Sequence, residues 1–195
     1  MDTYDFGPSC RLVADLLRDL PDDRLADPTP CEGLTVGDLC HHLVGLTLAF
    51  SMAARKEKPP GGGQPTSDAA QLEAGWRDQV VARLDDMVIG WAEPAAYEGM
   101  TYAGPIELPG FVAAQVALNE VVVHGWDVAA ATGRPYDADP AAVAVCLEFA
   151  TSFEAPEDAP DDDAKLFDPP VPVPDDAPVL HRLLGATGRD PGWTR

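Results

Sequence analysis

Residues 111–131, with the sequence FVAAQVALNEVVVHGWDVAAA, contain the pattern that decides the fold. The few polar residues in this stretch are Gln115, Asn119, Glu120, His124 and Asp127. A helix that is apolar on nearly every face is typical of the interior of a helical bundle. Thr132 and Gly133 follow, and a glycine at this point is suited to end the helix. We therefore expect residues 111–131 to form a buried helix at the centre of the fold.

The sequence before this helix predicts three more helices. Apolar residues recur at helical spacing over residues 12–20, and Pro21 ends that pattern. Thr35 is expected to begin the second helix as its N-cap, because Asp38 stands three residues later as in a capping box. An apolar stripe predicts the third helix over about residues 68–91.

The remaining segments predict a connection, two further helices and an acidic arm. Residues 97–110 are rich in glycine and proline, so they can hold at most a short hairpin or an ordered loop. An Asp-Pro pair begins residues 139–153, which are expected to form a fifth helix. Residues 154–176 contain nine acids, one base and many prolines, which predicts an extended or disordered arm. Apolar residues over 179–184 predict a short terminal helix that docks back on the body.

Together these elements predict an all-α protein. No strand pattern is long enough to found a sheet, and the sequence contains no internal repeat. We expect residues 1–153 to form a metal-binding helical bundle. We expect residues 154–195 to form the proline-rich acidic arm and the short terminal helix, which packs on the bundle.

The charge of the chain argues against two classes of partner. The 195 residues include 13 Lys+Arg and 33 Asp+Glu, which gives a formal net charge of −20. Such a surface repels phosphate backbones and anionic lipids, so we expect neither nucleic acid nor a membrane surface as a partner. No continuous apolar segment approaches the length needed to cross a bilayer, and the N-terminus lacks the pattern of a signal peptide. The expected compartment is the cytoplasm.

Two of the four cysteines, Cys40 and Cys146, are expected to be buried thiols. Cys10, Cys31, Cys40 and Cys146 show no CxxC spacing. Cys40 and Cys146 lie within apolar helical patterns, where a buried thiol is the common outcome. This pattern disfavours both a disulfide framework and a cysteine-based zinc ribbon.

The polar residues of the central helix predict its chemistry. Glu120, His124 and Asp127 are spaced at i, i+4 and i+7, so they share one face of the helix. An ionised carboxylate inside a bundle is costly unless it is paired or binds a metal. Glu120 and His124 would together bind a divalent ion, and Asp127, one turn further on, would orient a ligand from behind.

A third ligand must come from another helix, and the second helix contains His41 and His42. The spacing of His42 from Leu39 and Leu46 places it on the flank of the buried face, which favours His42 over His41. A His–Glu–His set leaves positions open for water or substrate, as in catalytic zinc sites. Nickel or iron would fit the same ligands almost as well.

A purely structural interpretation stands beside the metal hypothesis. In that interpretation, Glu120 and His124 form a buried hydrogen-bonded pair and His42 is a satisfied core histidine. Asn119 is expected to be a core or loop-binding amide rather than a ligand. The apolar surroundings and the histidine on a second helix favour the metal.

Three motifs resemble one protein family. Residues 29–43, TPCEGLTVGDLCHHL, resemble the second-helix motif of the mycothiol-dependent maleylpyruvate isomerase metal-binding family. Residues 118–127, LNEVVVHGWD, resemble the second metal motif of that family. Residues 182–193, RLLGATGRDPGW, resemble the C-terminal tail of one actinobacterial branch.

The resemblance implies a DinB-like four-helix bundle that holds a divalent metal, commonly zinc, at one end. The family motifs place the metal ligands at His42, Glu120 and His124, in agreement with the choice made from the residues. We ourselves expect Asp127 and Asn119 to support these ligands without binding the metal. The resemblance also implies mycothiol, or another low-molecular-weight thiol, as a co-substrate in isomerisation or S-transfer. The isomerase resembles a bundle followed by a separate C-terminal domain that contributes to its active site. This sequence has the acidic arm there, so we expect a reaction other than maleylpyruvate isomerisation.

The leading hypothesis is a cytoplasmic, metal-dependent enzyme. It would use a low-molecular-weight thiol either for S-transfer to a small electrophile or to isomerise that electrophile. A metal-dependent hydrolase is the alternative enzyme, because the metal could equally present hydroxide. A non-catalytic protein that binds a metal and a ligand in the same cleft is the third alternative. A bundle this apolar is also compatible with a homodimer.

Overall fold

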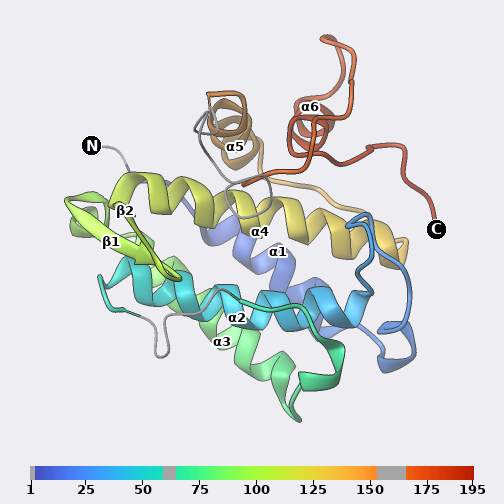
Figure 1. Ribbon diagram of the computed structural model, residues 1–195, viewed down its shortest axis with the longest axis horizontal. Helices are drawn as coiled ribbons and strands as arrows, with labels where there is room; N and C mark the ends of the chain where they lie inside the picture. Colours follow the sequence, from blue (N-terminus) through green and yellow to red (C-terminus); the bar gives the residue numbers. More distant parts are fainter. Residues whose placement is uncertain (1–2, 59–64, 153–165) are drawn as a thin grey trace.

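The central helix expected from the sequence is α4, Gly110–Thr132, which runs the length of the molecule in the computed structural model (Figure 1). The structure describes residues 3–58, 65–152 and 166–195. Most of the side chains of α4 are buried, including Asn119, His124 and Asp127. Gly133 ends the helix in the left-handed conformation, with φ of +67°. This is the glycine C-cap that the sequence predicts.

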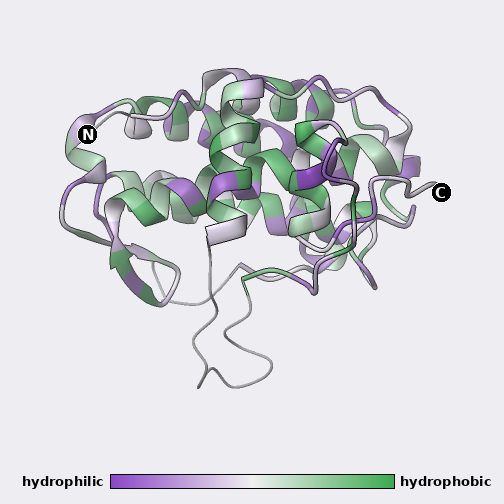
Figure 2. Cartoon of the chain, turned by 90° about the horizontal axis from the view of Figure 1, so that it is seen from above, coloured by the Kyte–Doolittle hydropathy of each residue, from purple (hydrophilic) through white to green (hydrophobic). Residues whose placement is uncertain are grey.

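Four helices form the bundle. They are α1 (Gly7–Arg18), α2 (Val36–Ala54), α3 (Trp76–Trp91) and α4. Helix α2 packs against α3 and α4, and α1 packs against the same two helices, so the four enclose one core. Figure 2 shows hydrophobic residues along the helices, and the buried core consists largely of residues from these four helices. The prediction of an all-α helical bundle is therefore confirmed.

Two further helices lie on the outer side of α4 in Figure 1. Helix α5, Pro140–Ser152, packs on α4, and α6, Val179–Ala186, packs on α5. Asp139 caps α5, since its Oδ2 accepts a hydrogen bond from the backbone N–H of Ala142 at 2.9 Å. The predicted acidic arm over 154–176 lies partly outside the described residues, which resume at residue 166.

Helix α2 begins with the capping box that its sequence predicts. Thr35 Oγ1 accepts a hydrogen bond from the backbone N–H of Asp38 at 3.2 Å, and Asp38 Oδ2 accepts one from the backbone N–H of Thr35 at 2.9 Å. By length and composition α2 could cross a membrane, contrary to the expectation above. However, 61% of its most apolar window is buried inside the bundle, as in the core helix of a soluble protein.

The third helix begins later than the sequence pattern predicts. Residues 69–71 form only a short 3-10 turn, and α3 starts at Trp76. Gly75 immediately before it has φ of +82°, a left-handed conformation that an α-helix cannot contain. The expected continuous helix over 68–91 is therefore wrong in its first two turns.

A short hairpin precedes α4. This agrees with the prediction that the segment, rich in glycine and proline, holds at most a short hairpin or an ordered loop. A 3-10 turn, Pro94–Tyr97, leads into strands β1 (Met100–Ala103) and β2 (Ile106–Pro109). The strands are antiparallel, with Met100 opposite Pro109. All four cysteines are free and buried, which confirms the prediction for Cys40 and Cys146. Burial raises the pKa of the Cys10, Cys40 and Cys146 thiols to about 12.

The close contact between the hairpin region and α4 predicts a large effect of Gly110→Ala on stability. A Cβ atom at Gly110 would lie 2.3 Å from the carbonyl oxygen of Ala96. Because this neighbour is backbone and cannot rotate away, we expect the free energy of unfolding to fall by about 3 kcal/mol in urea denaturation. The control is Gly133→Ala, which meets no atom within 4 Å but keeps a positive φ and should cost about 1 kcal/mol. Equal losses in the two variants would contradict the close approach.

Candidate metal centre

Three potential metal ligands converge between α2 and α4. His42 lies on α2, and Glu120 and His124 lie one turn apart on α4. The Nε2 atom of His124 is 3.1 Å from Glu120 Oε2, and the Nε2 atom of His42 is 3.7 Å from the same oxygen. The two imidazole rings are 5.2 Å apart and nearly perpendicular. One ligand atom from each residue lies within 4.8 Å of the others, so we call this set the metal group.

The tertiary packing also separates the two histidines of α2. His42 faces Glu120, whereas the Nδ1 atom of His41 lies 3.0 Å from the carbonyl oxygen of Thr66 and accepts a hydrogen bond from the backbone N–H of Asp68. His41 therefore holds the segment before α3 through these contacts, and its side chain is directed away from the metal group. Metal binding by the group itself stays a prediction.

Asp127 supports His124 from behind. Its side chain is fully buried, and its Oδ2 atom lies 2.9 Å from His124 Nδ1. This hydrogen bond occupies Nδ1, so Nε2 is the ring nitrogen that faces Glu120. Asn119 is also buried, but its Oδ1 has no hydrogen-bond partner among the described residues.

Two further residues contact Asp127, and neither was among the predicted site residues. The Cys31 thiol donates to Asp127 Oδ2 at 3.1 Å, from the connection that precedes α2. Arg189, which follows α6, donates from Nη2 to the same oxygen at 3.3 Å. Both residues lie inside the motifs quoted above, but neither sits in a periodic pattern that would have indicated its partner.

Cys31, His124 and Asp127 form a second group with the donor atoms of a metal site. Its place for a cation is already taken, because Arg189 Nη2 lies 3.3 Å from Cys31 Sγ and 3.3 Å from Asp127 Oδ2. A divalent ion beside this guanidinium would be repelled. The second group is therefore an ion-paired support for His124, and the metal group is the candidate centre.

The electrostatics of the metal group are those of a buried ion pair. Burial opposes ionisation of Glu120, but the charges and hydrogen bonds of His124 and His42 outweigh it and hold the pKa of Glu120 well below its usual value. Burial likewise opposes the charge on His124, yet Glu120 and Asp127 raise its pKa well above 6.5. In the metal-free protein, His124 is therefore protonated and paired with Glu120. A divalent cation would replace that proton.

The donor set fits a divalent metal ion. Two imidazole nitrogens and one carboxylate oxygen are the ligands of open zinc sites, and similar sets bind nickel and iron. The side chains of His42, Glu120 and His124 are 22%, 19% and 11% exposed, so the group can be reached from solvent. The buried Nδ1 atom of His42 has no hydrogen-bond partner among the described residues.

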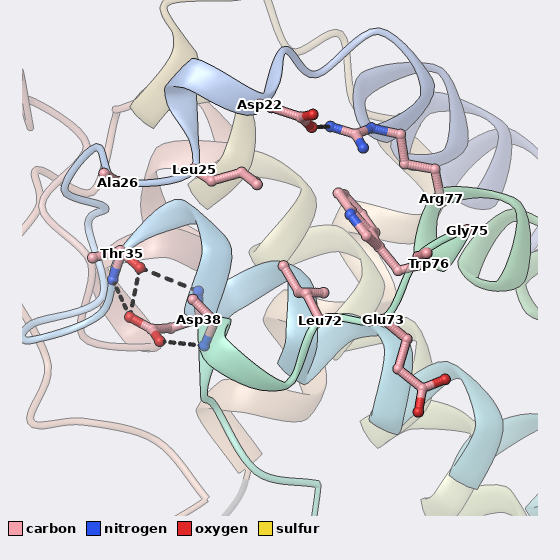
Figure 3. Close-up of a pocket in the computed structure, with 12 residues that line it drawn as sticks. Asp22, Leu25, Ala26, Thr35, Asp38, Leu72, Glu73, Gly75, Trp76 and Arg77 are labelled. Atoms are coloured by element: carbon pink, nitrogen blue, oxygen red, sulfur yellow. Dashed lines mark hydrogen bonds and ion pairs between the residues drawn. The ribbon is translucent and has the colours of Figure 1, made fainter.

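A separate open depression of about 810 Å³ lies near the N-terminal end of α2 (Figure 3). Several of its polar side chains are already paired. Arg77 Nη2 donates to Asp22 Oδ1 at 2.6 Å, and Asp38 Oδ1 accepts from the backbone N–H of Ala69 at 2.8 Å. None of the three metal-group residues lines this depression. It belongs to the capping and docking contacts of α2 and α3.

One family matches most of this chain. Residues 6–129 match the family described as mycothiol maleylpyruvate isomerase N-terminal domain. This range contains all three residues of the metal group. An uncharacterised protein of Mycobacterium tuberculosis, found in the strains CDC 1551 and H37Rv, is 29% identical over 177 residues, which are 90% of this chain and 91% of the relative.

The fold is also shared with a solved enzyme. The crystal structure of the mycothiol-dependent maleylpyruvate isomerase superposes with a TM-score of 0.54 at 15% sequence identity. A mutant of that isomerase superposes equally well, at 12% identity. The match covers 73% of this chain but only 63% of the isomerase chain. The likeness therefore confirms the DinB-like fold.

Proposed function

This chain belongs to the mycothiol maleylpyruvate isomerase N-terminal domain family, and from this membership we propose that it is a metal-dependent enzyme. It would use a low-molecular-weight thiol of the mycothiol type for S-transfer to, or isomerisation of, a small electrophile. The observation that carries the proposal is the convergence of His42, Glu120 and His124, whose ligand atoms lie within 4.8 Å of one another. A family match alone would not have required this geometry.

The ligands that we propose are His42, Glu120 and His124, and the proposed metal is zinc, with nickel or iron as alternatives. When bound, a divalent ion would act as a Lewis acid that favours the thiolate form of a thiol at neutral pH. The chain itself supplies orientation. Asp127 holds the proton of His124 at Nδ1, and Glu120 lies 3.1 Å from the opposite nitrogen of that ring.

The substrate differs, in our proposal, from that of the solved isomerase. The chain spans 63% of the length of that enzyme, so the activity of the whole isomerase does not transfer to it. A small electrophile and a thiol are the proposed partners. The charge of −20 supports a protein without nucleic-acid or membrane partners. A cytoplasmic location and a homodimer also belong to the proposal.

The metal assignment is tested by elemental analysis of the purified protein beside two histidine variants. We expect about one equivalent of metal in the wild type and a small fraction of that in His42→Ala. The matched control is His41→Ala, since His41 neighbours His42 on α2 but contacts the segment before α3. This control should keep its metal. Equal metal content in His42→Ala and the wild type would contradict the ligand set.

Catalysis is tested by turnover of model electrophiles with mycothiol. We expect thiol-dependent turnover by the wild type and its loss in Glu120→Ala, because the only carboxylate of the metal group is removed. Turnover that needs no thiol would instead support the metal-dependent hydrolase. Metal and ligand binding without any turnover would support the non-catalytic binding protein.

A further inference from the structure

Arg189, in the C-terminal segment of the chain, contacts two residues that lie behind the metal group, Asp127 and Cys31. Its Nη2 atom donates to Asp127 Oδ2 and to Cys31 Sγ, at 3.3 Å in each case. Its Nη1 atom donates to the carbonyl oxygen of Thr187 at 2.7 Å. The Arg189 side chain is only 10% exposed. An arginine this buried is uncommon unless it has a charged partner.

The end of α6 fixes this arginine in place. Leu183 and Leu184 are completely buried, so α6 is anchored before Arg189 begins. Gly188 then turns the chain with φ of +82°, and the backbone N–H of Arg189 donates to the carbonyl oxygen of Leu184 at 2.8 Å. Such a turn is a common way to end a helix. Arg189 is therefore delivered by a packed helix rather than by a loose tail.

The partner of Arg189 is the residue that orients His124. Asp127 is completely buried, and a carboxylate in that position needs a compensating charge and hydrogen-bond donors. One of its oxygens, Oδ2, receives both Arg189 and His124. A fixed Asp127 Oδ2 holds the His124 ring in the orientation that leaves Nε2 toward Glu120.

We propose that Arg189 is a positioning residue of the metal centre, acting through Asp127 on His124. In this arrangement, the C-terminal segment completes a centre whose ligands all lie within residues 6–129, the range of the family match. The proposal rests on the proposed function, because it requires that the metal group binds a divalent ion. Partners behind a ligating histidine commonly change metal affinity by about 10–100-fold.

The test measures Co²⁺ binding by the full chain, from the visible spectrum of the bound ion and by competition with a chelator. We expect Arg189→Met to lower the Co²⁺ affinity about 10–100-fold and to change the spectrum, because the His124 ring is less well fixed. Arg189→Lys, which keeps a charge but loses the fork, should restore part of the affinity.

Arg195→Met is the matched control. Arg195 lies in the same segment and donates to Asp27 Oδ2 at 2.6 Å, but its side chain is 49% exposed and it touches no residue of the metal group. Because an exposed ion pair contributes little, we expect its affinity to stay within about twofold of the wild type. An equal loss in Arg195→Met and Arg189→Met would show that docking of the segment, rather than Arg189, is responsible, and would overturn the proposal.

A second variant keeps the test decisive where Arg189→Met does not fold. The double variant Arg189→Met/Asp127→Asn removes both buried charges, and its amide oxygen still accepts a hydrogen bond from His124. We expect its Co²⁺ affinity to lie within about tenfold of the wild type. This is the smallest effect that partners behind a ligating histidine commonly have. If Arg189 acts through Asp127, its loss should change little in the Asp127→Asn background. A folded double variant whose Co²⁺ affinity lies more than about tenfold below that of Asp127→Asn alone would show that Arg189 acts through something other than Asp127.

The outcomes distinguish this proposal from the proposed function. A wild-type chain that binds no Co²⁺ overturns the metal centre itself and the role of Arg189 with it. A wild-type chain that binds Co²⁺, together with a folded Arg189→Met variant of unchanged affinity and spectrum, overturns the role of Arg189 and leaves the metal centre standing.

Discussion

Glu120→Gln is expected to lower the affinity for Zn²⁺ by more than about 100-fold. Loss of a partner behind a ligand already costs about 10–100-fold, and Glu120 is the only carboxylate of the metal group. The amide has the shape of the carboxylate but no charge, so packing is preserved. The measurement is competition with a chromophoric chelator at neutral pH.

The same substitution also affects the metal-free protein. Glu120 is paired with the protonated His124 at 3.1 Å, and the side chain of Glu120 is 19% exposed. Losing one partner of a fully buried pair costs about 3–5 kcal/mol, and the remaining exposure reduces this to about 2 kcal/mol here. Glu107→Gln, on the exposed side of β2, is the control and should change neither quantity. Wild-type zinc affinity in Glu120→Gln would remove Glu120 from the ligand set.

The second large effect is a steep pH dependence of metal affinity. The pKa of His124 is raised well above 6.5 in the metal-free protein, because the anionic Glu120 and Asp127 outweigh the effect of burial. Zinc needs the neutral imidazole, so binding must release this proton. At lower pH the protonated form of His124, which cannot bind zinc, is favoured. The apparent zinc affinity therefore falls as the pH falls. While His124 is protonated, we expect about a tenfold loss of zinc affinity for each unit by which the pH falls.

Zinc affinity measured by competition at a series of pH values checks this slope, and the proton release can be counted by calorimetry in buffers of different ionisation enthalpy. Asp127→Asn is the informative variant. It removes one anion that raises the pKa of His124, so the decline should begin at a lower pH. A zinc affinity in the wild type that is independent of pH between 6 and 8 would contradict the ion pair of Glu120 and His124.

Much of the bundle follows from local patterns. The capping box at Thr35, the glycine at the end of α4 and the Asp139 cap of α5 are all present where the sequence predicts them. These signals depend on residues within one helical turn of each other, which is why the sequence contains them. The predicted start of α3 was wrong because Gly75 has a left-handed φ, which interrupts the helix that the apolar pattern predicts.

The face that Glu120 shares with His124 was determined by the sequence alone, since 3.6 residues per turn place i and i+4 together in any α-helix. The approach of His42, with His41 turned away, was decided by how α2 packs on α4. Cys31 and Arg189 lie 96 and 62 residues from Asp127 along the chain. No helical period relates residues so far apart, and only the tertiary structure could bring them to one buried carboxylate.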